Sequence, residues 1–130
     1  MQASATVWTG RVLSALFVLF MLGASVAPKL LGMPVAEVTL TGLGWRPGNA
    51  FWIGIVELTL VLLYVFPPTS VLGAILFMAL FGGAMATNIR ADMPLFSHTL
   101  FSIYLALFMW GGLWLRDEKL RAQFPWRRGG

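Results

Sequence analysis

Four long apolar stretches, separated by charged or turn-forming residues, follow one another along the chain. Residues 12–28 carry no charged side chain, and as a helix they would measure roughly 25 Å, close to the thickness of the hydrocarbon layer of a bilayer. The pattern predicts an all-α fold, an integral membrane four-helix bundle built by residues 1–130 as a single domain. The expected spans cover about residues 10–28, 50–66, 71–89 and 99–115.

The connections between these stretches predict one further helix and one tight turn. Pro34 suits the first turn of a helix and Gly42 suits the residue that follows its end, so residues 34–41 are expected to form a short interfacial helix between spans one and two. Pro67 and Pro68 break the chain between spans two and three. Because this break is short, those two spans are expected to be antiparallel neighbours.

Composition supports the membrane interpretation. The chain is 58% hydrophobic and only 11% charged, whereas about 25% of the residues of an average soluble domain are charged. A globule of 130 residues could not bury so much apolar surface. The net charge of +4 does not indicate nucleic-acid binding, because the basic residues gather in the tail, residues 116–130, beside an apolar stretch.

The distribution of lysine and arginine predicts the orientation. Basic residues accumulate in the cytoplasmic parts of membrane proteins. With both termini in the cytoplasm, six basic residues lie on the cytoplasmic side, including Arg11 and the tail, against Lys29, Arg46 and Arg90 on the other side. We therefore expect both ends of the chain to be cytoplasmic. Arg11 is expected to act as a topology determinant and lipid phosphate anchor.

The chain contains no cysteine and a single histidine, His98. Disulfides, thiol relays, iron–sulfur ligation and zinc–thiolate sites are thereby excluded, and so is haem ligation by two histidines of one chain. Redox chemistry would have to use a diffusible cofactor or a partner protein. No catalytic constellation and no metal site is expected.

Glu57 lies in the middle of the second apolar stretch. An acidic side chain at the centre of a membrane helix costs roughly 2.5–3.5 kcal/mol on insertion scales, so Glu57 is expected to face the other helices and to be paired. Lys29 and Arg90, near the outer ends of their spans, are the candidate cations. The alternatives are a neutral glutamate hydrogen-bonded across helices, or an ion pair that only fixes the helix register.

Polar residues form a stripe on each expected span at helical spacing. On span one, Arg11, Ser14, Ser25 and Lys29 share one face. The stripes predict a polar seam inside the bundle and a ligand-binding cavity around the glutamate. The candidate lining residues are Glu57, Lys29, Arg90, Tyr64, Thr87 and His98.

Small residues are densest in the third stretch. Ala79 and Gly83, and likewise Gly82 and Ala86, are separated by three residues, a spacing that allows close approach of membrane helices. We expect these residues to mediate helix packing.

Several motifs, distributed in order along nearly the whole chain, resemble those of the DoxX-like membrane proteins. They are WTGRVLSA at residues 8–15, KLL at 29–31, IGIVEL at 53–58, LGAIL at 72–76, GGA and ATNIR within 82–90, LFSH at 95–98 and WGGLWLRD at 110–117. The resemblance implies a four-helix bundle in the inner membrane of a bacterium, an association with quinone-linked oxidoreductases, and recurring polar positions at Arg11, Lys29 and Glu57.

The chain departs from that family at the end of span three. Many relatives place a histidine there, whereas this chain has Thr87, Asn88 and Arg90. Chemistry that depends on that histidine would require His98, from span four, as a substitute.

Three functions remain open at this point. The first is a redox-associated accessory or ligand-binding subunit with quinone as its cofactor. The second is a small proton-coupled transporter that uses Glu57, and the third is a purely structural membrane scaffold. The expected partners are the lipid bilayer and either an oxidoreductase subunit or further copies of the chain.

Overall fold

The computed structural model describes residues 4–127, and in this range all regular structure is helical. The first long helix consists of α1 (Ala5–Phe20), the π-helical segment η1 (Met21–Val26) and α2 (Ala27–Leu30) without interruption. The remaining elements are α3 (Pro34–Gly42), α4 (Asn49–Val65), the 3₁₀ turn η2 (Pro67–Thr69), α5 (Ser70–Arg90), the π-helical turn η3 (Leu95–Thr99), α6 (Phe101–Arg116) and α7 (Glu118–Gln123).

The local sequence explains where these helices begin and end. The Ser4 hydroxyl caps α1 by accepting a hydrogen bond from the Val7 amide. After the proline break, the hydroxyls of Thr69 and Ser70 donate to the carbonyls of Leu63 and Tyr64, both at 2.7 Å. These bonds satisfy carbonyl groups that the end of α4 leaves without helical partners, and they fix α4 and α5 as antiparallel neighbours.

Three helical segments are long and apolar enough to cross a membrane. They are Ala5–Leu30, Pro67–Arg90 and Leu95–Arg116, whereas α4 is apolar but has only 17 residues. The prediction of an all-helical membrane protein is therefore confirmed, and three of the four helices expected as spans have the length and apolar character that a span requires. The short helix expected at residues 34–41 is present as α3.

The tail contains a helix that the sequence did not predict. Residues 118–123 form α7, whose first turn is capped by the Asp117 carboxylate, which accepts from the Leu120 amide at 3.2 Å. The Arg121 guanidinium donates to the carbonyls of Trp114 and Leu115, at the end of α6. The first half of the tail is thus folded back onto the end of α6.

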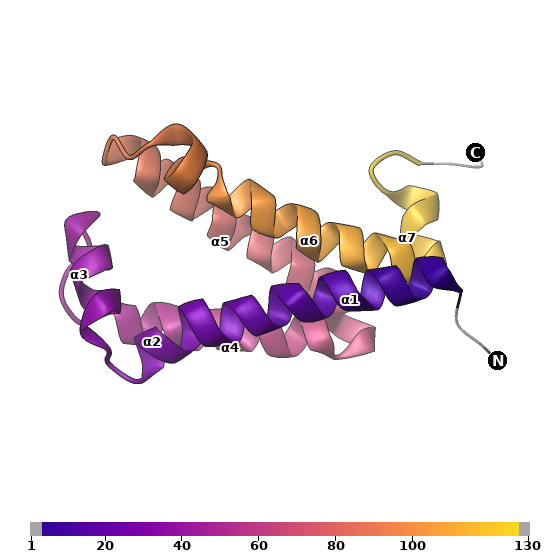
Figure 1. Cartoon of the computed structure of the whole chain (residues 1–130), viewed down its shortest axis with the longest axis horizontal. Helices are drawn as coiled ribbons and strands as arrows, with labels where there is room; N and C mark the ends of the chain where they lie inside the picture. Colours follow the sequence, from indigo (N-terminus) through magenta and orange to yellow (C-terminus); the bar gives the residue numbers. More distant parts are fainter. Residues whose placement is uncertain (1–3, 128–130) are drawn as a thin grey trace.

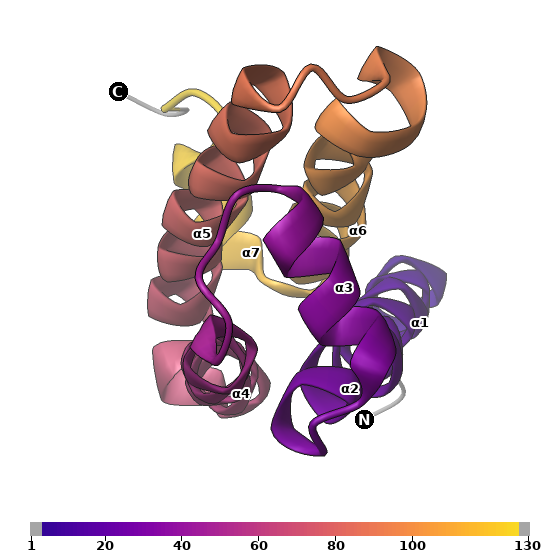
Figure 2. The same ribbon diagram turned by 90° about the vertical axis from the view of Figure 1, so that its left-hand side faces the viewer.

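The long helices form two layers that meet at one end and separate towards the other (Figure 1). One layer contains α1 and α4, and the other contains α5 and α6, with α1 packed along α6 and α4 along α5. The beginning of α1 and α7 lie at the closed end. At the open end, α3 lies across the space between the layers (Figure 2).

Glycines allow the close contacts at the closed end. A Cβ atom on Gly10 would lie 2.6 Å from the Gly112 carbonyl oxygen, and one on Gly73 would lie 2.6 Å from the Tyr64 amide nitrogen. By contrast, no atom lies within 4 Å of a Cβ built on Gly82 or Gly83. The expectation that the small residues of span three mediate packing is therefore wrong for these two glycines, because no neighbouring helix lies in contact with either of them, and Gly83 instead lines a cavity between the layers.

An aromatic core fills the closed half of the molecule. Phe17 contacts the rings of Tyr64, Phe77 and Phe81 in edge-to-face arrangements, and all four side chains are at most 4% exposed. The opposite helix faces carry exposed leucines such as Leu19, which is consistent with contact with lipid. The open half lacks a comparable core, and this is where the polar residues gather.

Candidate functional site

A closed network of three side chains joins the first long helix to α4. The Lys29 Nζ atom lies 2.7 Å from Glu57 Oε1 and donates to the Ser25 hydroxyl at 2.8 Å, and that hydroxyl donates to Glu57 Oε2 at 2.8 Å. The side chains of Lys29 and Glu57 are 16% and 6% exposed. Both carboxylate oxygens are therefore satisfied, as a buried charge requires.

Local backbone features bring these three residues together. Gly54, one turn before Glu57, lets α2 approach α4 so closely that a Cβ on it would lie 2.9 Å from the Lys29 Cβ. Ser25 belongs to the π-helical segment η1, where the widened turn shifts the faces of the helix relative to α1. Such π-helical turns occur frequently at functional sites in proteins.

The network lies on the wall of a cleft between the two layers. An inner chamber of about 470 Å³ is lined on one side by Glu57, Lys29 and Ser25. An outer chamber of about 650 Å³ shares Lys29 and Ser25 with it and reaches α3 and η3. The walls of the inner chamber are largely apolar and include Phe20, Met21, Leu80, Phe81, Phe101 and Leu105.

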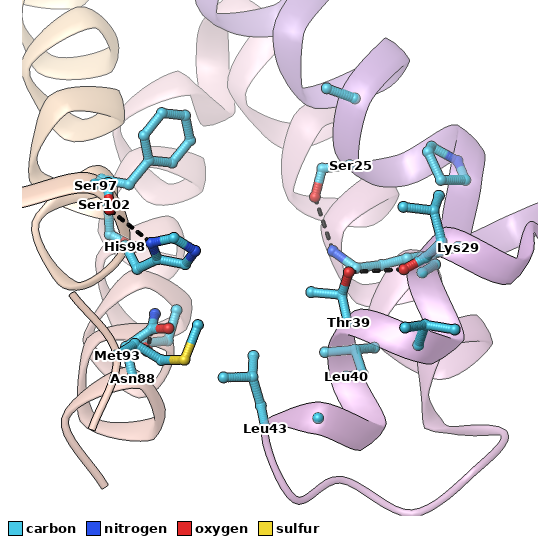
Figure 3. A pocket seen from close by; sticks show the side chains of 18 residues that line it. Ser25, Lys29, Thr39, Leu40, Leu43, Asn88, Met93, Ser97, His98 and Ser102 are labelled. Carbon is cyan, nitrogen blue, oxygen red and sulfur yellow. Dashed lines mark hydrogen bonds between the residues drawn. The ribbon is translucent and has the colours of Figure 1, made fainter. Parts of the chain in front are cut away.

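Polar side chains face one another across the outer chamber (Figure 3). Ser25, Lys29 and Thr39 lie on one wall, and Asn88, Ser97 and His98 lie on the other. The His98 Nδ1 atom and the Ser97 hydroxyl are 2.8 Å apart, and Asn88 donates to the Ala84 carbonyl at 2.9 Å. A molecule in the cleft would thus find hydrogen-bonding groups on two sides and apolar walls beneath them.

Of the residues predicted for the cavity, four line the cleft. Glu57 and Thr87 line the inner chamber, His98 lines the outer chamber, and Lys29 lines both. The hydroxyl of Thr87 donates to the Gly83 carbonyl at 2.8 Å, within its own helix.

Arg90 does not reach the glutamate. Its guanidinium donates to the Leu43 carbonyl at 2.8 Å and thereby links the end of α5 to the loop that follows α3. The two layers are apart at this end, and Arg90 belongs to the layer opposite α4. Arg90 therefore contacts the loop, whereas Lys29, which belongs to the same layer as α4, pairs with Glu57.

Tyr64 is separate from the cleft. It lies two helical turns beyond Glu57 in α4, at the closed end, where its hydroxyl donates to the Met109 carbonyl at 2.7 Å and lies 2.9 Å from the Ser14 hydroxyl. The Arg116 Nε atom donates to Ser14 at 3.2 Å. These residues form a second polar cluster, which holds α1, α4 and α6 together.

The polar stripe predicted for span one is divided in the structure. Ser14 belongs to the cluster at the closed end, whereas Ser25 and Lys29 belong to the cleft. Arg11 is exposed, with its Cζ atom 4.8 Å from the centre of the Trp8 ring. Its expected role as a topology determinant and phosphate anchor stays a prediction.

The cleft also contains residues that were not predicted for it, including Asn88, Ser97 and Ser102. Ser25 had been placed on the polar stripe but not in the site, although its spacing of four residues from Lys29 put both on one helix face. No group of three potential metal ligands occurs among the described residues.

Long apolar helices around a buried ion pair define the chain as a helical integral membrane protein. The sequence profile described as the DoxX-like family matches residues 12–112, a range that contains both partners of the ion pair. The chain therefore belongs to the DoxX-like family. No curated protein and no solved structure matched it significantly.

Proposed function

We propose that this protein binds a quinone-like lipid in the cleft beside Lys29 and Glu57, as an accessory or ligand-binding subunit of a quinone-linked system. The observation that carries the proposal is the Lys29–Ser25–Glu57 network, held at the edge of a largely apolar chamber. A membrane protein retains a charged pair at such depth at a cost, and intramembrane ionisable groups are functional by default.

The chemistry of the cleft suits such a ligand. A quinone ring presents two carbonyl oxygens, which accept hydrogen bonds, and an apolar tail. The Lys29 ammonium has three donor hydrogens, two of which serve Glu57 and Ser25, so one stays available for a carbonyl. Across the outer chamber, His98 offers a second donor or acceptor.

We further propose that all four long helices cross the inner membrane of a bacterium, with both termini in the cytoplasm. Two observations support this topology. The beginning of α1 and α7 lie at the same end of the molecule (Figure 1), and Gly10, the chain neighbour of Arg11, lies against the backbone of Arg116. Helix α4 has 17 residues, the lower limit for a span, and runs alongside α5.

A transporter that exchanges protons for cations at Glu57 is less well supported. Such a carboxylate must be able to release its cation, whereas here Lys29 occupies Oε1 and Ser25 occupies Oε2. A covalently tethered ammonium 2.7 Å away competes with any diffusible cation.

Binding of decylubiquinone to the purified protein in lipid nanodiscs tests the proposal. We expect Lys29→Met, Glu57→Gln and the double variant each to weaken binding about tenfold or more, the loss typical of a charge-assisted hydrogen bond. Glu37→Gln is the matched control, because Glu37 is a half-buried acid of α3 that accepts from the Gly48 amide and lines neither chamber.

The double variant guards against a folding artefact, because it removes both charges together and leaves neither unpaired. Its elution as a folded species on size-exclusion chromatography, together with loss of binding, would support the site. Absence of quinone binding by the wild-type protein, or unchanged binding by all three variants, would refute it. Co-migration with a quinone-reactive oxidoreductase on native gels is the expected sign of an accessory role.

A further inference from the structure

The first long helix and α6 are in contact over only part of their length. They meet closely at Gly10 and Gly112, and again where the rings of Phe20 and Phe101 are 5.5 Å apart between centres. Beyond Phe20 the chain enters η1, and η1 and α2 pack onto α4. The seam between the first helix and the beginning of α6 therefore opens at the π-helical segment.

The cleft reaches this seam. Ala24 and Phe101 line both chambers and are nevertheless exposed, and Pro28 and His98 line the outer chamber on either side. A residue that lines a cavity and is also exposed marks a place where that cavity is open. Ala24 lies at the level of the buried ion pair, since Ser25 is its neighbour in the chain and contacts Glu57.

On the opposite side, the seam between α4 and α5 lies beside the loop that follows α3. The loop after α3 passes in front of α5 on its way to α4 (Figure 2). The Arg90 guanidinium donates to the Leu43 carbonyl in this loop, and Trp45 from the same loop lines the inner chamber. Trp45, Ala79 and Gly83 line the inner chamber on this side and are exposed as well, so the tethered loop narrows this opening without closing it, whereas the opening at Ala24 lies next to Ser25 of the polar network.

We propose that the seam between η1 and the beginning of α6 is a lateral opening through which the hydrocarbon tail of the ligand extends into the bilayer. This inference rests on the proposed function and adds the class of ligand, an amphiphile whose polar ring lies beside Lys29 and whose tail lies between Ala24 and Phe101. Such a molecule is already dissolved in the membrane and reaches the site without passing through water.

A pair of probes separates this inference from the function on which it rests. Decylubiquinone carries a tail, whereas 2,3-dimethoxy-5-methyl-1,4-benzoquinone has the same ring without one. We expect Ala24→Phe, which places a bulky ring in the opening, to weaken binding of the tailed probe about tenfold, the effect of overfilling a packed space. Binding of the tailless probe should change less than about twofold, within the uncertainty of such comparisons.

Ala15→Phe is the matched control, because Ala15 is exposed on α1 and lines neither chamber. Equal effects of Ala24→Phe on both probes, or no effect on either, would overturn the lateral opening and leave the binding site intact. If the wild-type protein binds neither probe, the proposed function is refuted instead.

A second measurement does not depend on binding. Because the chain has no cysteine, a single spin label can be attached at Ala24→Cys, at Ala15→Cys as a lipid-facing reference, or at Ala74→Cys, whose native side chain is fully buried. We expect the label at residue 24 to be relaxed by oxygen, which concentrates in lipid, as strongly as the label at residue 15. Greater relaxation by a water-soluble nickel complex than by oxygen would overturn the inference.

Discussion

Removal of either partner of the Lys29–Glu57 pair should cost far more stability than removal of both. Breaking a buried ion pair by deleting one partner typically costs about 3–5 kcal/mol, because the remaining charge is left buried. Lys29 keeps 16% of its side chain exposed, so some water reaches the pair and the lower end of that range applies. We expect about 3 kcal/mol for Lys29→Met.

The double variant Lys29→Met/Glu57→Gln should lose only about 1 kcal/mol, because no charge is then stranded and the glutamine can still accept from Ser25. Unfolding of the detergent-solubilised protein by sodium dodecyl sulfate, in a double-mutant cycle, measures the coupling between the two positions. With about 3 kcal/mol for each single variant and about 1 kcal/mol for the double variant, we expect a coupling energy of about 5 kcal/mol. If the double variant instead loses as much stability as the two single variants together, the reasoning is refuted, because the two side chains then do not act as a pair.

Two other contacts lead to further predictions. Gly10→Ala should destabilise the protein by about 1–3 kcal/mol in the same assay, because its new Cβ would meet the Gly112 carbonyl, whereas Gly23→Ala, which has open space around it, should be nearly neutral. Arg90→Met should accelerate amide hydrogen exchange in the loop at residues 43–48 about five- to tenfold by removing the bond to the Leu43 carbonyl, and unchanged exchange would contradict the role of Arg90 as a tether.

The long apolar helices and the pairing of Glu57 with Lys29 could be predicted from the sequence because both follow from the cost of burial. An acid at mid-depth in an apolar stretch requires a cation within reach, and few cations are available in this chain. The prediction also included Arg90, which is wrong as a partner of Glu57. The distance between these residues depends on how far the two layers separate, and helical periodicity contains no information on that separation.

Other features depend on geometry that local sequence does not encode. Tyr64 and Glu57 share a helix face, yet two turns of α4 place them in different polar clusters. The π-helical segment η1 has no distinctive residue pattern, so its effect on Ser25 could not be foreseen. The small residues of span three suggested packing, but spacing alone does not show which side of a helix meets a neighbour, and Gly10 and Gly112 take that role instead.

The contact between Gly10 and Gly112 has a consequence for residues far from it. Helices α1 and α6 are rigid and contact each other closely near one end, so the geometry of this contact sets the angle between their axes. Phe101 lies roughly 16 Å from Gly112 along α6, at 1.5 Å per residue, so a tilt of about 4° at this contact would shift the distant rim by about 1 Å. A single methyl group added at Gly10 would therefore alter the width of the cleft without touching any residue that lines it.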